Sequence, residues 1–235
     1  MAAYLYGIVP AGAAAPAVAG VHDRPVDVVP AGNGLALVRS DVDDDRVQPR
    51  RAHLVAHDRV LAAAMAAGPV LPLRFGVVTE HDAATVAAEL DEERVRDRMA
   101  VLDGRVEVQL LWDLAEDVAV ERVVAAAPQV RDPALGDLDR GRVVSEVMAS
   151  LAATDVARIA LRLGGRIVTR GEVEERGTSG ARVALLVDAA RVDDLLEACR
   201  ELAEEVAVAG TLRTVGALPP YSFADLHVEL DGQVA

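Results

Sequence analysis

The chain has 235 residues, 52% of them hydrophobic, and a formal net charge of −14. This length allows one domain or two with a buried core. The acidic balance argues against two classes of partner: nucleic acid, whose phosphates bind clustered positive charge, and an anionic membrane surface. We find neither an export signal nor an uninterrupted apolar stretch of membrane-spanning length, and we therefore expect a cytoplasmic protein.

Cysteine and lysine usage narrow the possible chemistry. Cys199 is the only cysteine, which excludes an intramolecular disulfide and a cysteine-based zinc site. It falls on the apolar stripe of a predicted helix, and we interpret it as a core residue. All 24 basic side chains are arginines; we attribute this to genomic base composition rather than to selection for binding.

The first part of the chain, residues 1–103, is predicted to be a mixed α/β domain. Its predicted strands cover residues 4–9, 26–29, 35–38 and 70–78. Its predicted helices cover residues 49–67 and a second segment that begins at a capping-box-like stretch, 79–82, and continues to about residue 98.

The second part, residues 104–215, has a recognisable order of elements. Predicted strands cover residues 105–112, 166–173, 181–187 and 206–212, and helices lie between the first and second and between the third and fourth. The order β–α(α)–β–β–α–β predicts a modified ferredoxin-like (βαββαβ) domain with an enlarged first crossover. The fold class is therefore α+β with two domains.

A C-terminal tail, residues 216–235, contains the motif PPYSF. The alternation of apolar and polar residues over 224–230 predicts a half-buried terminal strand.

Histidines give the only hint of a metal site. His53 and His57 are spaced i, i+4 on the first predicted helix, and His81 is nearby in sequence. No HExxH motif is present, because Leu54 follows His53, and no third ligand is indicated. We interpret His53 and His57 as solvent-facing side chains and predict no metal.

No other motif indicates catalysis. The acidic run at residues 41–45 lacks the spacing and glycine of a calcium loop, and the glycine-containing turn at 32–34 leads into a strand rather than a helix. No serine lies in a GxSxG elbow. We therefore predict neither an enzyme nor a cofactor.

Two segments combine proline, glycine and aromatic residues in an unusual way. They are LPLRFG at residues 71–76 and LPPYSFADL at residues 218–226. A proline in a strand belongs on a sheet edge, and a double proline fixes an extended backbone. We expect these residues to serve architecture, or to contact a partner in addition: Pro72, Arg74, Phe75, Gly76, Pro219, Pro220, Tyr221 and Phe223.

These two segments, together with YLYGIV at residues 4–9 and VEVQLLWD at 106–113, resemble the gas vesicle protein F/L family (GvpF and GvpL) in sequence and order. The resemblance covers essentially the entire chain. It departs from the family pattern at Leu218, where the family commonly has tryptophan, and at Val77, where it usually has threonine.

The resemblance implies a non-enzymatic accessory or minor structural protein of gas vesicles. Its implied partners are the hydrophobic shell protein GvpA and other vesicle accessory proteins, and it implies the two-domain architecture described above. Two alternatives stay open on the residues alone. The first is a ferredoxin-like regulator that senses a small molecule, and the second is a cofactor-free enzyme on the same fold.

Overall fold

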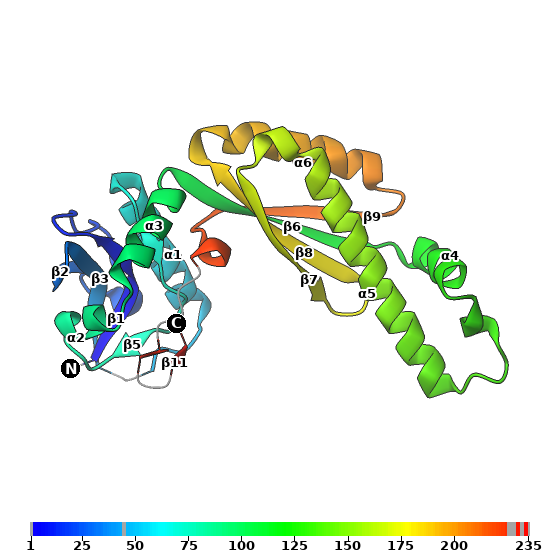
Figure 1. The fold of residues 1–235 in the computed structure, drawn as a ribbon, viewed down its shortest axis with the longest axis horizontal. Coiled ribbons are helices and arrows are strands. Elements are labelled where there is room, and N and C mark those ends of the chain that lie inside the picture. Colours follow the sequence, from blue (N-terminus) through cyan, green and yellow to red (C-terminus); the bar gives the residue numbers. More distant parts are fainter. Residues whose placement is uncertain (1, 44–45, 225–228, 231–232, 235) are drawn as a thin grey trace. The chain divides into compact units, whose positions relative to one another are not determined.

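The chain passes from one structural unit into a second and then returns to the first (Figure 1). The first unit comprises Met1–Val106 and Leu218–Ala235, and the second comprises Glu107–Ala217. The structure is a computed structural model that describes residues 2–43, 46–224, 229–230 and 233–234. The C-terminal PPYSF motif therefore belongs to the same unit as the N-terminus.

An antiparallel sheet forms the centre of the first unit. Its strands are β1 (Ala2–Pro10), β2 (Asp27–Gly32), β3 (Leu35–Val42), β4 (Leu71–Pro72) and β5 (Val78–Thr79). The order is β2-β3-β1-β4, and β5 also pairs with β1. Asn33 and Gly34 have φ of 53° and 74°, the left-handed conformation that a tight turn between β2 and β3 requires.

The predicted extended run over residues 70–78 is interrupted in the structure. Gly76 has φ of 101°, and the chain turns there, so that β4 and β5 pair with two separate parts of β1. Pro72 lies opposite Gly7 in β4, at the end of the sheet, as expected for a residue without an N–H to donate.

The described residues of the first unit form three α-helices: α1 (Arg51–Ala67), α2 (Ala83–Ala88) and α3 (Glu92–Leu102). The prediction of one helix continuing to residue 98 is wrong, because the chain stops and restarts. Asp82 caps α2 by accepting a hydrogen bond from the Thr85 N–H at 2.8 Å, and Asp91 caps α3 through the Arg94 N–H at 3.1 Å. Each aspartate accepts a hydrogen bond from an otherwise unpaired backbone N–H at the start of a helix, and this stabilisation favours two separate helices.

The second unit contains a four-stranded sheet and its crossover helices. The strands are β6 (Arg105–Leu114), β7 (Thr169–Arg176), β8 (Gly180–Asp188) and β9 (Gly210–Leu218), in the order β7-β8-β6-β9. The helices are α4 (Glu116–Ala126), α5 (Asp137–Arg162) and α6 (Val192–Val206). The element order is the predicted one, and the α+β fold class is confirmed.

Both long helices of the second unit cover the same face of its sheet (Figure 1). Trp112 of β6 is the largest side chain in this core and is 1% exposed. The Cβ of any larger residue at position 210 would lie 2.6 Å from the Trp112 ring, so Gly210 is required for this close approach. Cys199 of α6 lies in the same core, as predicted.

An ion pair connects α4 to α5. The Arg122 guanidinium donates to both carboxylate oxygens of Asp155, with N–O distances of 2.5 and 2.9 Å. This bidentate contact raises the pKa of Arg122.

The predicted terminal strand over residues 224–230 falls mainly on 225–228, which lie outside the described residues. Short 3-10 turns occur elsewhere, among them η1 (Val21–Asp23) and η5 (Tyr221–Phe223). Beyond η5, β10 (Glu229–Leu230) pairs with β11 (Gln233–Val234).

Candidate functional site

The most distinctive feature of the first unit is a set of rings around a buried histidine. Tyr4 and Tyr6 are two residues apart on β1 and therefore point to the same side of the strand, with ring centroids 4.9 Å apart. His57 projects from α1 to within 5.7 Å of the Tyr4 ring and 5.5 Å of the Tyr6 ring. Phe75 lies 5.7 Å from His57, and Tyr221 lies 6.0 Å from it in a stacked geometry. We call these five residues the tyrosine–histidine cluster.

Hydrogen bonds determine the protonation of His57. The Leu73 carbonyl oxygen, 3.2 Å from Nε2, can only accept, so Nε2 carries the proton. Tyr4 Oη accepts from the Gly76 N–H at 3.1 Å, and its own proton is donated to His57 Nδ1 at 2.9 Å. Both ring nitrogens are therefore occupied, and the neutral tautomer is fixed by its surroundings.

A second chain of hydrogen bonds passes through Tyr6. Its hydroxyl accepts from the Val21 N–H at 2.7 Å. Ser40 donates its proton to the Pro25 carbonyl at 2.8 Å, so Tyr6 must be the donor in the 3.0 Å bond to Ser40 Oγ. A Cβ at position 20 would lie 2.2 Å from the Tyr6 hydroxyl, and Gly20 therefore permits this arrangement.

Tyr221 attaches the C-terminal motif to α1. Its ring stacks on His57 with an interplanar angle of 20°, and its hydroxyl donates to Asp58 Oδ1 at 2.7 Å. The tail residues Pro219 and Pro220 that precede it are buried. One residue of the PPYSF motif is therefore held by two adjacent residues of a helix far earlier in the sequence.

Burial controls the ionisation of the cluster. Desolvation lowers the pKa of His57 from 6.5 to about 4, although the Asp58 charge and the Leu73 carbonyl act in the opposite direction. Burial likewise raises the pKa of Tyr4 and of Tyr6. The cluster is therefore uncharged near neutral pH, and its groups are not poised for proton transfer there.

The interpretation of His57 as solvent-facing is wrong. The side chain is 1% exposed because it lies on the same helix face as Val60, Leu61 and Ala64, all of which are buried. His53 is half-buried, and its ring contacts that of His22 with centroids 4.6 Å apart. Spacings of three, four and seven residues from buried positions could have revealed the burial of His57.

Two of the expected motif residues, Phe75 and Tyr221, are members of the cluster, and a third, Gly76, donates its N–H to Tyr4. Pro72 occupies the sheet edge, and Arg74 beside it is exposed. Phe223 is half-buried in η5. Sequence reasoning missed Tyr4 and His57 as partners of these segments.

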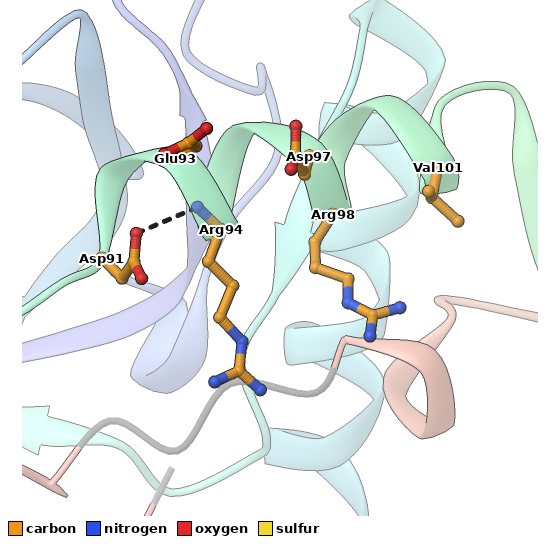
Figure 2. A pocket seen from close by; sticks show the side chains of 6 residues that line it. All are labelled: Asp91, Glu93, Arg94, Asp97, Arg98 and Val101. Carbon is orange, nitrogen blue, oxygen red and sulfur yellow. Dashed lines mark hydrogen bonds between the residues drawn. The ribbon is translucent and has the colours of Figure 1, made fainter.

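A hollow of about 420 Å³ lies along α3. Figure 2 shows the side chains that line it. Its lining consists of Asp91, Glu93, Arg94, Asp97, Arg98 and Val101. The side chains of Arg94 and Arg98 extend to the same side in this view. Sites for small molecules are predominantly apolar with a few polar groups, so this charged and largely exposed lining does not support such a site.

Metal ligation also finds no support in the arrangement of donors. Among the residues that the structure describes, no group of three or more His, Cys, Asp or Glu side chains gathers to hold an ion. His57 would have to break both of its hydrogen bonds to act as a ligand. Within the same described ranges, no helix has the length and apolar character needed to cross a membrane.

Comparison with known proteins agrees with this architecture. The family "Gas vesicle synthesis protein GvpL/GvpF" matches residues 2–225. Gas vesicle protein F of Streptomyces sp. (strain CB03234) is 32% identical over 246 residues, covering 96% of this chain and 100% of that protein. Crystal structures of GvpF from Microcystis aeruginosa and Anabaena sp. PCC7120 match with TM-scores of 0.75 and 0.74, each at 20% identity. The former covers 96% of this chain and 99% of its own, and the latter 96% of both.

The fold and the site define a two-unit α+β protein. The hydrogen-bonded side chains of the tyrosine–histidine cluster hold the first unit together and do not form an open reaction centre. The chain belongs to the GvpL/GvpF family of gas vesicle synthesis proteins. Membership of this family supports a role in gas vesicle assembly and interaction with other gas vesicle proteins.

Proposed function

We propose that this chain is a cytoplasmic accessory protein that binds the hydrophobic shell protein GvpA, or other vesicle accessory proteins, and limits aggregation of the shell protein during nucleation. The observation that carries the proposal is the match to gas vesicle protein F over the full length of that relative. No cofactor, nucleic acid or membrane takes part in this function.

The physical basis is the contrast between this acidic chain and the hydrophobic shell protein. A shell subunit that assembles through apolar surface and strand edges aggregates when those surfaces are exposed. A partner with a net charge of −14 keeps a complex dispersed, because like-charged complexes repel one another. Binding that covers the subunit and releases it at the growing vesicle would then control where assembly begins.

In this proposal, the motif residues act mainly through architecture. Gly76 and Tyr221 hold Tyr4, His57 and Asp58 in place, and Pro72 ends the sheet. Arg74 is exposed and Phe223 is half-buried, and they are the motif residues best suited to touch a partner.

A pull-down tests the proposal. The purified chain is immobilised and offered GvpA fused to a soluble carrier, the carrier alone, and each purified vesicle accessory protein. We expect retention of GvpA or of at least one accessory protein, and lower light scattering when GvpA is released from its carrier in the presence of the chain. Retention of none of these proteins would contradict the proposal.

A further inference from the structure

The outer face of α1 lacks the carboxylates that are frequent elsewhere in this acidic protein. The residues exposed on the side opposite the core are Arg51, Ala52, Val55, Arg59, Ala62 and Ala66. Val55 is 46% exposed, and Leu54 at the border of this face is 40% exposed. We call the six residues on that side the α1 outer face: Arg51, Ala52, Val55, Arg59, Ala62 and Ala66. It contains no acidic residue, although the chain has 38 of them.

The helix α6 in the second unit shows what an ordinary solvated face looks like in this chain. Its exposed residues are Asp193, Asp194, Glu197, Arg200, Glu201, Glu204 and Glu205. Repeated carboxylates of this kind maintain solubility. The α1 outer face instead presents small apolar side chains and arginines to solvent, and solvation alone does not explain it.

The only acidic residue in α1 is used elsewhere. Asp58 is half-buried and accepts the hydrogen bond from Tyr221. Arg51 and Arg59 form no ion pair within the described part of the chain. They are spaced i, i+8 with Val55 midway between them, so one row along the helix has a cation at each end and an apolar side chain in the middle.

Arg51, at the first position of α1, also opposes the helix dipole. Four other helices have two acidic side chains each in the first turn, namely α3, α4, α5 and α6. The first turn of α1 has none; it begins with Arg51 after an Arg50 cap that makes no side-chain hydrogen bond. Cations at a helix N-terminus are unfavourable, which is a cost that an acidic partner would remove.

We propose that the α1 outer face is the docking surface for an amphipathic helix of a partner, with an apolar stripe flanked by Asp or Glu. This inference rests on the proposed function, since the partner is a component of the gas vesicle. Alanines at 52, 62 and 66 allow a second helix to approach closely, because the distance between helix axes depends on side-chain size at the contact. Arg51 and Arg59 then pair with carboxylates on the two sides of the stripe.

Site-specific crosslinking tests the location. Val55→Cys and, as a matched control on the exposed face of α6, Glu201→Cys each introduce one reactive thiol, because the native Cys199 is 1% exposed. Each variant is labelled with a photoreactive maleimide and mixed with the vesicle component that the wild-type chain retains in the pull-down. We expect a covalent adduct from position 55 and none from position 201.

Charge reversal tests the chemistry. Arg51→Glu with Arg59→Glu should weaken binding at least about tenfold, whereas Arg200→Glu on α6 should leave it unchanged. Glutamate at position 51 suits the first turn of a helix, and position 59 is exposed, so both substitutions should leave the chain folded, which thermal unfolding of the double variant checks. Binding of the double variant at wild-type strength, or adducts from both positions, overturns the docking surface while leaving the proposed function in place. Failure of the wild-type chain to bind any vesicle component overturns both.

Discussion

Tyr221 donates a hydrogen bond of 2.7 Å to Asp58, a residue 163 positions earlier in the chain. The bond joins the PPYSF motif to α1 and closes the tyrosine–histidine cluster from the C-terminal side. It also uses the only carboxylate of α1, which leaves the exposed side of that helix without negative charge.

Removing this hydroxyl should destabilise the first unit. Tyr221→Phe keeps the stacking on His57 but leaves the half-buried Asp58 carboxylate without this donor, for an expected loss of roughly 1–2 kcal/mol. Denaturant unfolding of the single variants and of the double variant with Asp58→Ala measures the coupling between the two residues. Additive effects of the two substitutions would contradict a direct interaction.

His57 should make the protein less stable in mild acid. The unfolded ring binds a proton near pH 6.5, whereas the folded ring does so near pH 4, so the unfolded state holds more protons between these values. The contribution of the neutral ring is complete above about pH 6.5 and is lost as the pH falls towards 4. The full loss amounts to about 3 kcal/mol.

The comparison that isolates this effect is His57→Gln against His53→Gln, a half-buried histidine on the same helix. Free energies of unfolding measured from pH 7 to pH 4 should fall less steeply for His57→Gln than for the wild type. The His53→Gln variant serves as the control for replacing a histidine on this helix. An unchanged slope for His57→Gln would show that other groups carry the acid sensitivity.

Glycine replacements should have opposite effects at two positions. Gly20→Ala places a Cβ 2.2 Å from the Tyr6 hydroxyl and 2.6 Å from Ser40 Oγ, and overpacking of this kind costs about 1–3 kcal/mol. In Gly141→Ala the new Cβ meets nothing within 4 Å beyond its chain neighbours and the adjacent backbone of α5, and the substitution should stabilise the helix by about 0.5–1 kcal/mol. Thermal unfolding of the two variants beside the wild type checks both signs; a stabilising Gly20→Ala would contradict the close packing around Tyr6.

The stabilisation from the ion pair between α4 and α5 should depend on the two-point contact of arginine as well as on its charge. Arg122→Ala leaves Asp155 nearly buried without its partner, and we expect a loss of about 2 kcal/mol because the arginine itself is partly exposed. Arg122→Lys restores the charge but not the two-point contact, so its stability should lie between those of the wild type and the alanine variant. Equal stability of the lysine variant and the wild type would argue against the two-point geometry.

Local patterns in the sequence were sufficient for most of the second unit. Residues 105–112 alternate clearly, residues 181–187 form a nearly continuous apolar run, and the glycine pair at 164–165 marks the end of the long helix, so the order of elements could be predicted. The helix after residue 79 was predicted too long because apolar spacing continues across Asp91, and only the cap shows that the chain restarts there.

The candidate site was much harder to predict, because its members come from distant parts of the chain. PPYSF and LPLRFG were recognised as unusual, but their common partner His57 was not, since its spacing from buried residues indicates burial but not which rings it contacts. The bond from Tyr221 to Asp58 depends on tertiary placement, which periodicity does not report.

The composition of the first unit from two separate stretches has a consequence for synthesis. A ribosome makes α1 early, but Tyr221 emerges only after every residue of Glu107–Ala217 has been polymerised. While the second unit is being translated, His57 therefore has no stacking partner. The second unit can fold during this interval. Throughout that interval the first unit of the nascent chain is incomplete. Synthesis of Tyr221 then supplies the ring that stacks on His57.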